Sequence, residues 1–197
     1  MRAARALLLL AVALPVGAAG AQQPTTPPVN PIATAFRNQT RNTRRNIAQA
    51  LDSIPESKYG YKPTPAQLTI GYIAQHVTED DYFFCNNFGD NKATLPDKDT
   101  QTPDSVRATW PKDTLMAKLK ASMAFCDDAL AHLDDAKVGE MLTITGPNGQ
   151  TRQISRANYL IGHVSDLADH YSQLANYMRL NGMLPPTALP RPGRGGK

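Results

Sequence analysis

Two side chains near the end of this 197-residue sequence have the types and the spacing of a metal-ligand pair. Asp166 and His170 are four residues apart, so on a helix they share one face with β-carbons about 5–6 Å apart. A carboxylate and an imidazole at that separation can bind one ion together. The same spacing also suits a hydrogen-bonded core pair, and spacing alone favours that interpretation.

The sequence has only three other histidines. His163 precedes His170 by two helical turns, about 10.5 Å along the axis, which is too far for both to bind the same ion. His132 lies among aspartates and is expected at the surface. His76 is therefore the imidazole left to supply a third ligand from another helix. Two nitrogens and one carboxylate oxygen would leave a position for water or substrate, as in catalytic zinc sites and some iron and nickel sites.

Four segments that must position these side chains repeat apolar residues every three or four positions, which is the period of an amphipathic helix. Proline or glycine follows most of them, as expected at helix ends. The segments run from Ile32 to Ile54, from Ile70 to Phe88, from about Lys112 to Leu133, and from Leu160 to Met178.

Two of the connections between these segments have sequence patterns that predict their structure. Leu142 to Ile144 and Thr151 to Ile154 flank the turn signal Pro147-Asn148-Gly149, which predicts a short β-hairpin before the last helix. Asp90 to Pro111 is expected to be a long polar loop, and its length allows a crossover connection. The sequence thus predicts an all-α four-helix bundle with one hairpin.

The first residues have the pattern of an export signal. Arg2 and Arg5 precede the apolar run Leu7 to Leu14, and Ala19-Gly20-Ala21 offers a cleavage site. We expect residues 1–21 to be a signal peptide and the mature protein to be periplasmic or extracellular. No later segment approaches the ~18 apolar residues of a membrane span, so no membrane association is expected after cleavage. A retained N-terminal anchor helix is the alternative.

Composition sets the remaining boundaries. Residues 22–31 are rich in Pro and Thr and residues 188–197 in Pro, Gly and Arg, so both are expected to be disordered and residues 32–187 to form the bundle.

Five of the 21 basic residues lie in the leader and tail, which leaves 16 against all 17 acidic residues. This near-neutral core predicts no nucleic-acid binding. Four arginines that share one helical face are expected to be solvated: Arg37, Arg41, Arg44 and Arg45.

The two cysteines leave an alternative open. Cys85 is expected on the second helix and Cys126 on the inner face of the third. In an exported protein they can form a disulfide that persists. The alternative is two buried thiols.

The sequence resembles the DinB-like family over nearly all of the mature domain. Residues 169–174, Asp-His-Tyr-Ser-Gln-Leu, and residues 177–186, which end in Met-Leu-Pro-Pro, look like the family's closing helix. Residues 54–65 and Ile73-Ala74-Gln75-His76-Val77 resemble the entry to its second helix. The resemblance implies a four-helix bundle, often paired as a homodimer, in which a histidine of the second helix and an H-x3-H pair of the last helix bind a divalent metal.

His76 and His170 match two of those ligand positions. At the third this sequence has Asp166 in place of histidine, and Ser172 replaces the usual glycine. A related branch, similar to mycothiol-dependent maleylpyruvate isomerase, has a carboxylate at that position and still binds zinc. The resemblance therefore implies that His76, Asp166 and His170 bind one divalent metal, zinc or nickel. If there is catalysis, Asp80, one turn beyond His76, could orient the His76 imidazole without itself binding the ion.

The resemblance does not name a reaction. A metal-dependent hydrolase acting on a small molecule is one expectation, and a non-catalytic metal-binding or structural bundle is the alternative. Thiol-transferase members of the family use low-molecular-weight thiols of the cytosol, from which an exported member would be separated. A thiol-dependent transferase is therefore the less favoured enzyme class.

Overall fold

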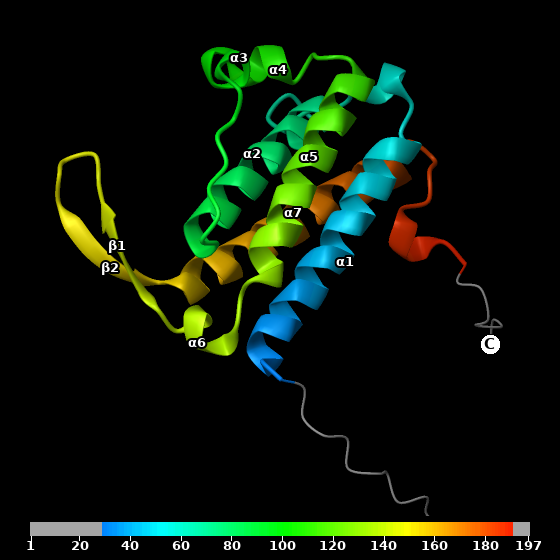
Figure 1. Cartoon of the computed structure of the whole chain (residues 1–197). Coiled ribbons are helices and arrows are strands. Elements are labelled where there is room, and N and C mark those ends of the chain that lie inside the picture. The colour runs from blue at the N-terminus through cyan, green and yellow to red at the C-terminus, as the bar shows by residue number, and fades with distance from the viewer. Residues whose placement is uncertain (1–28, 191–197) are drawn as a thin grey trace, which may run out of the picture.

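The computed structural model describes residues 29–190 and is built on four long helices (Figure 1). These are α1 (Pro31–Ser53), α2 (Ile70–Phe88), α5 (Lys112–Ala131) and α7 (Arg156–Leu180). Helix α2 packs on α5 and α7, and α1 packs on α7 and α5, which closes the bundle. The expectations for residues 1–28 and 191–197, including the signal peptide, lie outside the described residues.

Local sequence accounts for where the helices begin and end. Pro31 lies at the start of α1, where the missing N–H costs nothing. The hydroxyl of Thr69 accepts a hydrogen bond from the backbone N–H of Tyr72 at 3.1 Å and caps α2. Gly182 follows α7 with a φ of 71°, a left-handed conformation that favours glycine.

The link between α2 and α5 returns along the length of the bundle, so these two helices run in the same direction (Figure 1). The expectation that residues 90–111 form only a loop is wrong, because they include α3 (Asp97–Gln101) and α4 (Asp104–Arg107). Pro96 and Pro103 each immediately precede one of these short helices, and proline is a common residue at a helix start. Both helices lie at the end of the bundle where α2 and α5 begin.

The predicted β-hairpin before the last helix is confirmed. β1 (Met141–Thr145) pairs with β2 (Thr151–Ser155) in antiparallel register, and Leu142 lies opposite Ile154. The hairpin projects from the bundle (Figure 1), and the short helix α6 (Asp135–Val138) precedes it. Two single-turn helices, η1 (Glu56–Lys58) and η2 (Pro186–Ala188), complete the described elements.

The core has two parts, both made mainly by the predicted apolar faces. One is centred on Ile73, Leu119 and Leu174. The other includes Phe88, Leu130 and Leu160 and contains a disulfide between Cys85 and Cys126 that joins α2 to α5. No helix within residues 29–190 is long and apolar enough to cross a membrane.

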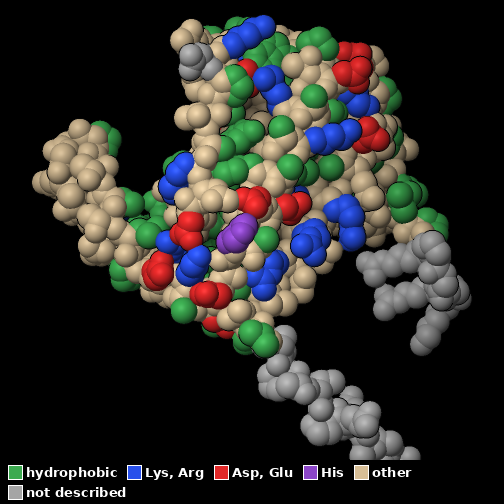
Figure 2. Space-filling view, viewed as in Figure 1, with side chains coloured by type: hydrophobic (Ala, Val, Ile, Leu, Met, Phe, Trp, Pro, Cys, Tyr) green, Lys and Arg blue, Asp and Glu red, His purple; other side chains and the backbone are tan. Residues whose placement is uncertain are grey.

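The expectation that all four arginines of α1 are solvated is wrong for Arg44. Its side chain is buried and pairs with Asp81 of α2 and Asp127 of α5. Elsewhere the surface is mixed in charge. Figure 2 shows Lys and Arg interspersed with Asp and Glu over the face formed by α1 and α5.

Candidate metal centre

The packing of α2 against α7 brings two histidines and two aspartates together. His76 and Asp80 come from α2, and Asp166 and His170 come from α7. Each residue offers one nitrogen or oxygen, and these four atoms all lie within 4.8 Å of one another. The two residues from each helix are one turn apart and therefore share a face.

The separations place Asp80 Oδ2 between the two imidazoles. It lies 3.2 Å from His76 Nε2 and 3.9 Å from His170 Nε2. On the other helix, Asp166 Oδ1 is 3.3 Å from His170 Nε2. The imidazole rings meet edge to face with centroids 5.0 Å apart. Both imidazoles thus direct Nε2 toward the carboxylates, so the donor atoms converge.

Burial is graded across the cluster. The exposed fraction of the side chain rises from 6% in His170, through 17% in Asp80 and 23% in Asp166, to 33% in His76. One oxygen of each carboxylate, Oδ2 in both, is buried without a hydrogen-bond partner among the described residues, and so is His170 Nδ1. A buried oxygen of this kind is costly unless something binds it.

The proximity of these groups changes their affinity for protons. Burial, and then the charge of Asp166, raises the pKa of Asp80 to about 7. Burial by itself would lower the pKa of His170, but the hydrogen bond and charge of Asp166 outweigh it and raise that pKa. Burial, and then the neighbouring His170, lower the pKa of His76. A divalent ion between the two carboxylates would offset their mutual repulsion.

The structure brings together the three residues that the sequence pointed to, His76, Asp166 and His170. Asp80 contacts the His76 imidazole as expected, but its Oδ2 lies 3.2 Å from Nε2 and within the cluster, so Asp80 is also a candidate ligand. The signal for it was present in the sequence. His76 and Asp80 have the same four-residue spacing as Asp166 and His170.

The other two histidines lie apart from this cluster. His163 is buried, and its Nε2 is 2.9 Å from Asp81 Oδ1, in a second group of polar side chains. The expectation that His163 does not share a site with His170 agrees with this position. His132, which directly follows α5, is exposed, as expected.

A wall of polar residues from α2 and α4 flanks the His76 side of the cluster. The Tyr72 ring lies 5.7 Å from the His76 ring, and its hydroxyl donates to Asp104 over 3.4 Å. Arg107 pairs with Asp104 at 2.6 Å and also with Glu79. The short helix α4 is thereby held against α2 beside His76.

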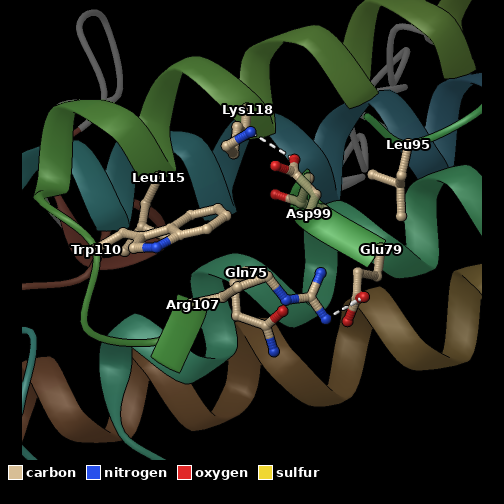
Figure 3. Close-up of a pocket in the computed structure, with 9 residues that line it drawn as sticks. Gln75, Glu79, Leu95, Asp99, Arg107, Trp110, Leu115 and Lys118 are labelled. Atoms are coloured by element: carbon tan, nitrogen blue, oxygen red, sulfur yellow. Dashed lines mark hydrogen bonds and ion pairs between the residues drawn. The ribbon is translucent and has the colours of Figure 1, made fainter. Parts of the chain in front are cut away.

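A separate cavity lies between α2 and α5 (Figure 3), and none of the four clustered residues lines it. Arg107 and Glu79 meet at one side, while Lys118 pairs with Asp99 at another. The amide of Gln75 is buried in its wall without a hydrogen-bond partner among the described residues. The cationic side chains here are already neutralised, so the cavity offers no net charge to a ligand.

The fold and the site together define a helical-bundle protein with a candidate metal centre between its second and last long helices. A family model described as the DinB superfamily matches residues 39–174, and the chain belongs to this superfamily. No curated protein matches the sequence significantly.

Solved structures with the same fold share little sequence with this chain. A DinB-like protein from Bacillus cereus matches with a TM-score of 0.58 and 17% identity, over 78% of this chain and 95% of that one. A conserved protein from Enterococcus faecalis matches with a TM-score of 0.55 and 13% identity, over 76% and 96%. The mycothiol-dependent maleylpyruvate isomerase matches with a TM-score of 0.56 and 14% identity, over 72% of this chain. The match spans 60% of the isomerase's own length.

Proposed function

We propose that this protein binds one divalent metal ion through His76, Asp166 and His170, with Asp80 as a further oxygen donor. The observation that carries the proposal is the convergence of two Nε2 atoms and two carboxylates within 4.8 Å. The donor chemistry fits, because imidazole nitrogen together with carboxylate oxygen is a common ligand set for zinc and nickel. Asp166 Oδ2, which is buried without a hydrogen-bond partner among the described residues, would gain one when an ion binds, and Asp80 Oδ2, which lies 3.2 Å from His76 Nε2, would gain a stronger one.

Metal entry should be coupled to loss of a proton from this cluster. Asp80, with a pKa of about 7, can hold a proton at Oδ2 near neutral pH. Ligands bind metal in their deprotonated forms, so that proton leaves as the ion enters. Glu79, one position before Asp80, is kept away from the ion by its pairing with Arg107.

The reaction we propose is metal-dependent hydrolysis of a small ester or amide. A bound divalent ion would lower the pKa of a water or polarise a carbonyl. The residues of the chain hold the ion and leave it accessible, since His76 is the most exposed of the four and lies toward solvent. Tyr72 and the pair Arg107–Asp104 form the polar wall that a substrate would contact on that side.

Metal analysis of the purified protein, followed by hydrolysis assays on the zinc-loaded and nickel-loaded forms, tests both parts of this proposal. We expect activity that is lost in His170→Ala and retained in His132→Ala, a matched control whose imidazole is exposed far from the cluster. Metal binding without activity toward esters or amides would leave the chain as a non-catalytic metal-binding bundle. Absence of metal binding would overturn the proposal as a whole.

A thiol-dependent transferase is the second candidate, and the fold shared with mycothiol-dependent maleylpyruvate isomerase favours it. A thiol could bind the ion as a further ligand or in place of the Asp80 carboxyl. Isothermal titration of the metal-loaded protein with a low-molecular-weight thiol separates the two candidates. If the protein is a hydrolase, it should turn over its substrate without added thiol.

We propose further that the chain is exported, with cleavage after Ala21. The pattern of residues 1–21 supports this, and a disulfide such as Cys85–Cys126 is stable outside the reducing cytosol. Mass spectrometry of secreted material should find Gln22 at the N-terminus, and an intact Met1 would contradict export by cleavage. We also propose that the partner of this protein is a small molecule, and that it binds neither nucleic acid nor a membrane after cleavage. The protein is further proposed to be a homodimer, and light scattering can measure its mass in solution.

A further inference from the structure

A second group of metal-ligating side chains lies in the core, one turn further along α2. Asp81 and Cys85 come from α2, Cys126 from α5 and His163 from α7. All four are buried, and each offers one atom within 4.8 Å of the others. In the described structure the two sulfurs are joined as a disulfide.

We propose that the reduced form of this chain binds a divalent metal ion through Cys85, Cys126, His163 and Asp81. The ion would replace the disulfide as the cross-link between α2 and α5. The proposal does not depend on the His76–His170 centre. The two covalent states exclude each other, because a sulfur is either in the S–S bond or available as a thiolate ligand.

The donor set suits zinc. Two thiolates, one imidazole and one carboxylate make four ligands, and fully enclosed four-ligand sites are typical of structural zinc. The Cα atoms of Cys85 and Cys126 are 5.4 Å apart, so both sulfurs can approach one ion to about 2.3 Å once the S–S bond is broken and the side chains rotate.

The polar surroundings already hold the imidazole in place. His163 Nε2 lies 2.9 Å from Asp81 Oδ1, and the hydroxyl of Ser122 donates to Asp81 Oδ2 at 2.9 Å. The other ring nitrogen of His163 is buried with no hydrogen-bond partner among the described residues. The imidazole packs against the rings of Phe84 and Phe88, with ring centroids 5.3 and 5.9 Å away, and this packing restricts its plane. Because this ring packing restricts the imidazole before any ion binds, His163 loses little side-chain entropy on binding one.

The charges balance as well. Two thiolates and the Asp81 carboxylate carry three negative charges, and a divalent ion carries two positive charges. The third positive charge is that of Arg44, which is buried with its Nε 3.6 Å from Asp81 Oδ1; its other partner, Asp127, is 55% exposed and is therefore also stabilised by water. Buried charge that is fully compensated avoids the large cost of an isolated ion.

The conversion balances in electrons and protons. Reduction breaks the S–S bond with two electrons and two protons, both supplied by a dithiol reductant that becomes a disulfide itself. The two cysteine thiols then release their protons to solvent as the ion binds. A newly made chain has two thiols before any disulfide forms, so it could bind the ion without a reduction step.

The test compares the oxidised and reduced forms of the same protein. Each form is stripped with a chelator and titrated with Zn²⁺ for stoichiometry and with Co²⁺ for its spectrum. A phosphine is the reductant, because it carries no thiol and takes its oxygen from water. We expect the reduced form to bind one more equivalent than the oxidised form, and a thiolate-to-cobalt charge-transfer band in the reduced form alone.

Variants separate this site from the first one. Cys85→Ser with Cys126→Ser should lose the band and the extra equivalent, while His76→Ala with His170→Ala should lose one equivalent and keep the band. Equal stoichiometry in the oxidised and reduced forms, or an extra equivalent without a thiolate band, would overturn the proposal. A parallel titration in urea must show weaker binding, since equal affinity there would mean that two thiols of an unfolded chain bind the ion.

Discussion

Asp80 and Asp166 face each other across the contact between α2 and α7, each with one oxygen that is buried and has no hydrogen-bond partner among the described residues. Their i,i+4 partners His76 and His170 also meet, because the two helices run in opposite directions. The repulsion between two buried carboxylates is unfavourable on its own. The arrangement of the two carboxylates becomes favourable when a divalent cation lies between them.

Loss of the Asp166 carboxylate should weaken zinc binding strongly. Asp166→Ala removes one of the donors, and we expect the affinity for Zn²⁺ to fall about 100-fold or more, beyond the 10–100-fold typical of losing a supporting residue. Asp166→His should keep or strengthen binding, because imidazole suits both zinc and nickel. Competition titration against a chromophoric chelator measures each affinity.

His132→Ala is the matched control, since it removes an exposed imidazole far from the cluster. His163→Ala should also affect zinc binding by the oxidised protein less than Asp166→Ala does. If Asp166→Ala bound zinc as tightly as the parent while His163→Ala lost it, the choice of ligands would be wrong.

Much of this centre could be predicted from helical spacing and from the family resemblance. The period of the fourth amphipathic segment placed Asp166 and His170 on one face, and the resemblance placed His76 opposite them. Spacing alone could not decide whether Asp80 faces the centre, because that depends on how α2 is rotated about its axis. That rotation is set by the packing of residues such as Ile73 and Val77 in the core.

The buried polar contacts around Asp81 in the core were harder to predict from the sequence. Arg41 and Arg45, close to Arg44 in sequence, are exposed, and only the position of Asp81 on another helix gives Arg44 a buried partner. The two cysteines posed the same problem, since a disulfide requires the distance between α2 and α5. Contacts between helices distant in sequence are fixed by packing, which no local pattern shows.

Truncating a core leucine of α7 should be costly. Leu174 is fully buried, so Leu174→Ala should reduce the free energy of unfolding by about 2–5 kcal/mol. Leu189→Ala is the control, because that side chain is 52% exposed and its change should be within about 0.5 kcal/mol of neutral. Chemical denaturation of the metal-free proteins measures both, and equal midpoints would contradict the position of α7 in the core.

Removing the buried guanidinium of Arg44 should destabilise the bundle through Asp81. Arg44→Ala leaves the Asp81 carboxylate buried with one charged partner fewer, and breaking a buried pair in this way costs about 3–5 kcal/mol. Arg41→Ala, on the exposed face of the same helix, should cost less than about 0.5 kcal/mol. Thermal unfolding followed by circular dichroism compares them. Similar melting temperatures would show that Arg44 is not needed to compensate Asp81.

The carboxyl of Asp80 should make the stability of the metal-free protein depend on pH. Its pKa of about 7 in the folded chain lies above the ordinary aspartate value of 3.8, so the folded state keeps the proton longer than the unfolded state does. Stability from this group is therefore present at low pH and is lost as the pH rises through about 7. The raised pKa of His170 acts in the same direction, whereas the lowered pKa of His76 acts in the opposite direction below its ordinary value of 6.5.

Asp80→Asn isolates the contribution of Asp80, because the amide cannot ionise. In the presence of a chelator we expect the parent and the variant to be similarly stable near pH 5, and the variant to be more stable by about 1–2 kcal/mol near pH 8.5. Asp52→Asn, an exposed change on α1, should show no such trend. Denaturation midpoints at the two pH values give the comparison. With saturating Zn²⁺ the order near pH 8.5 should reverse, since the parent then gains the binding energy of an ion that the variant holds less tightly. A variant that never exceeds the parent in the metal-free state would show that Asp80 is not held at a raised pKa by Asp166.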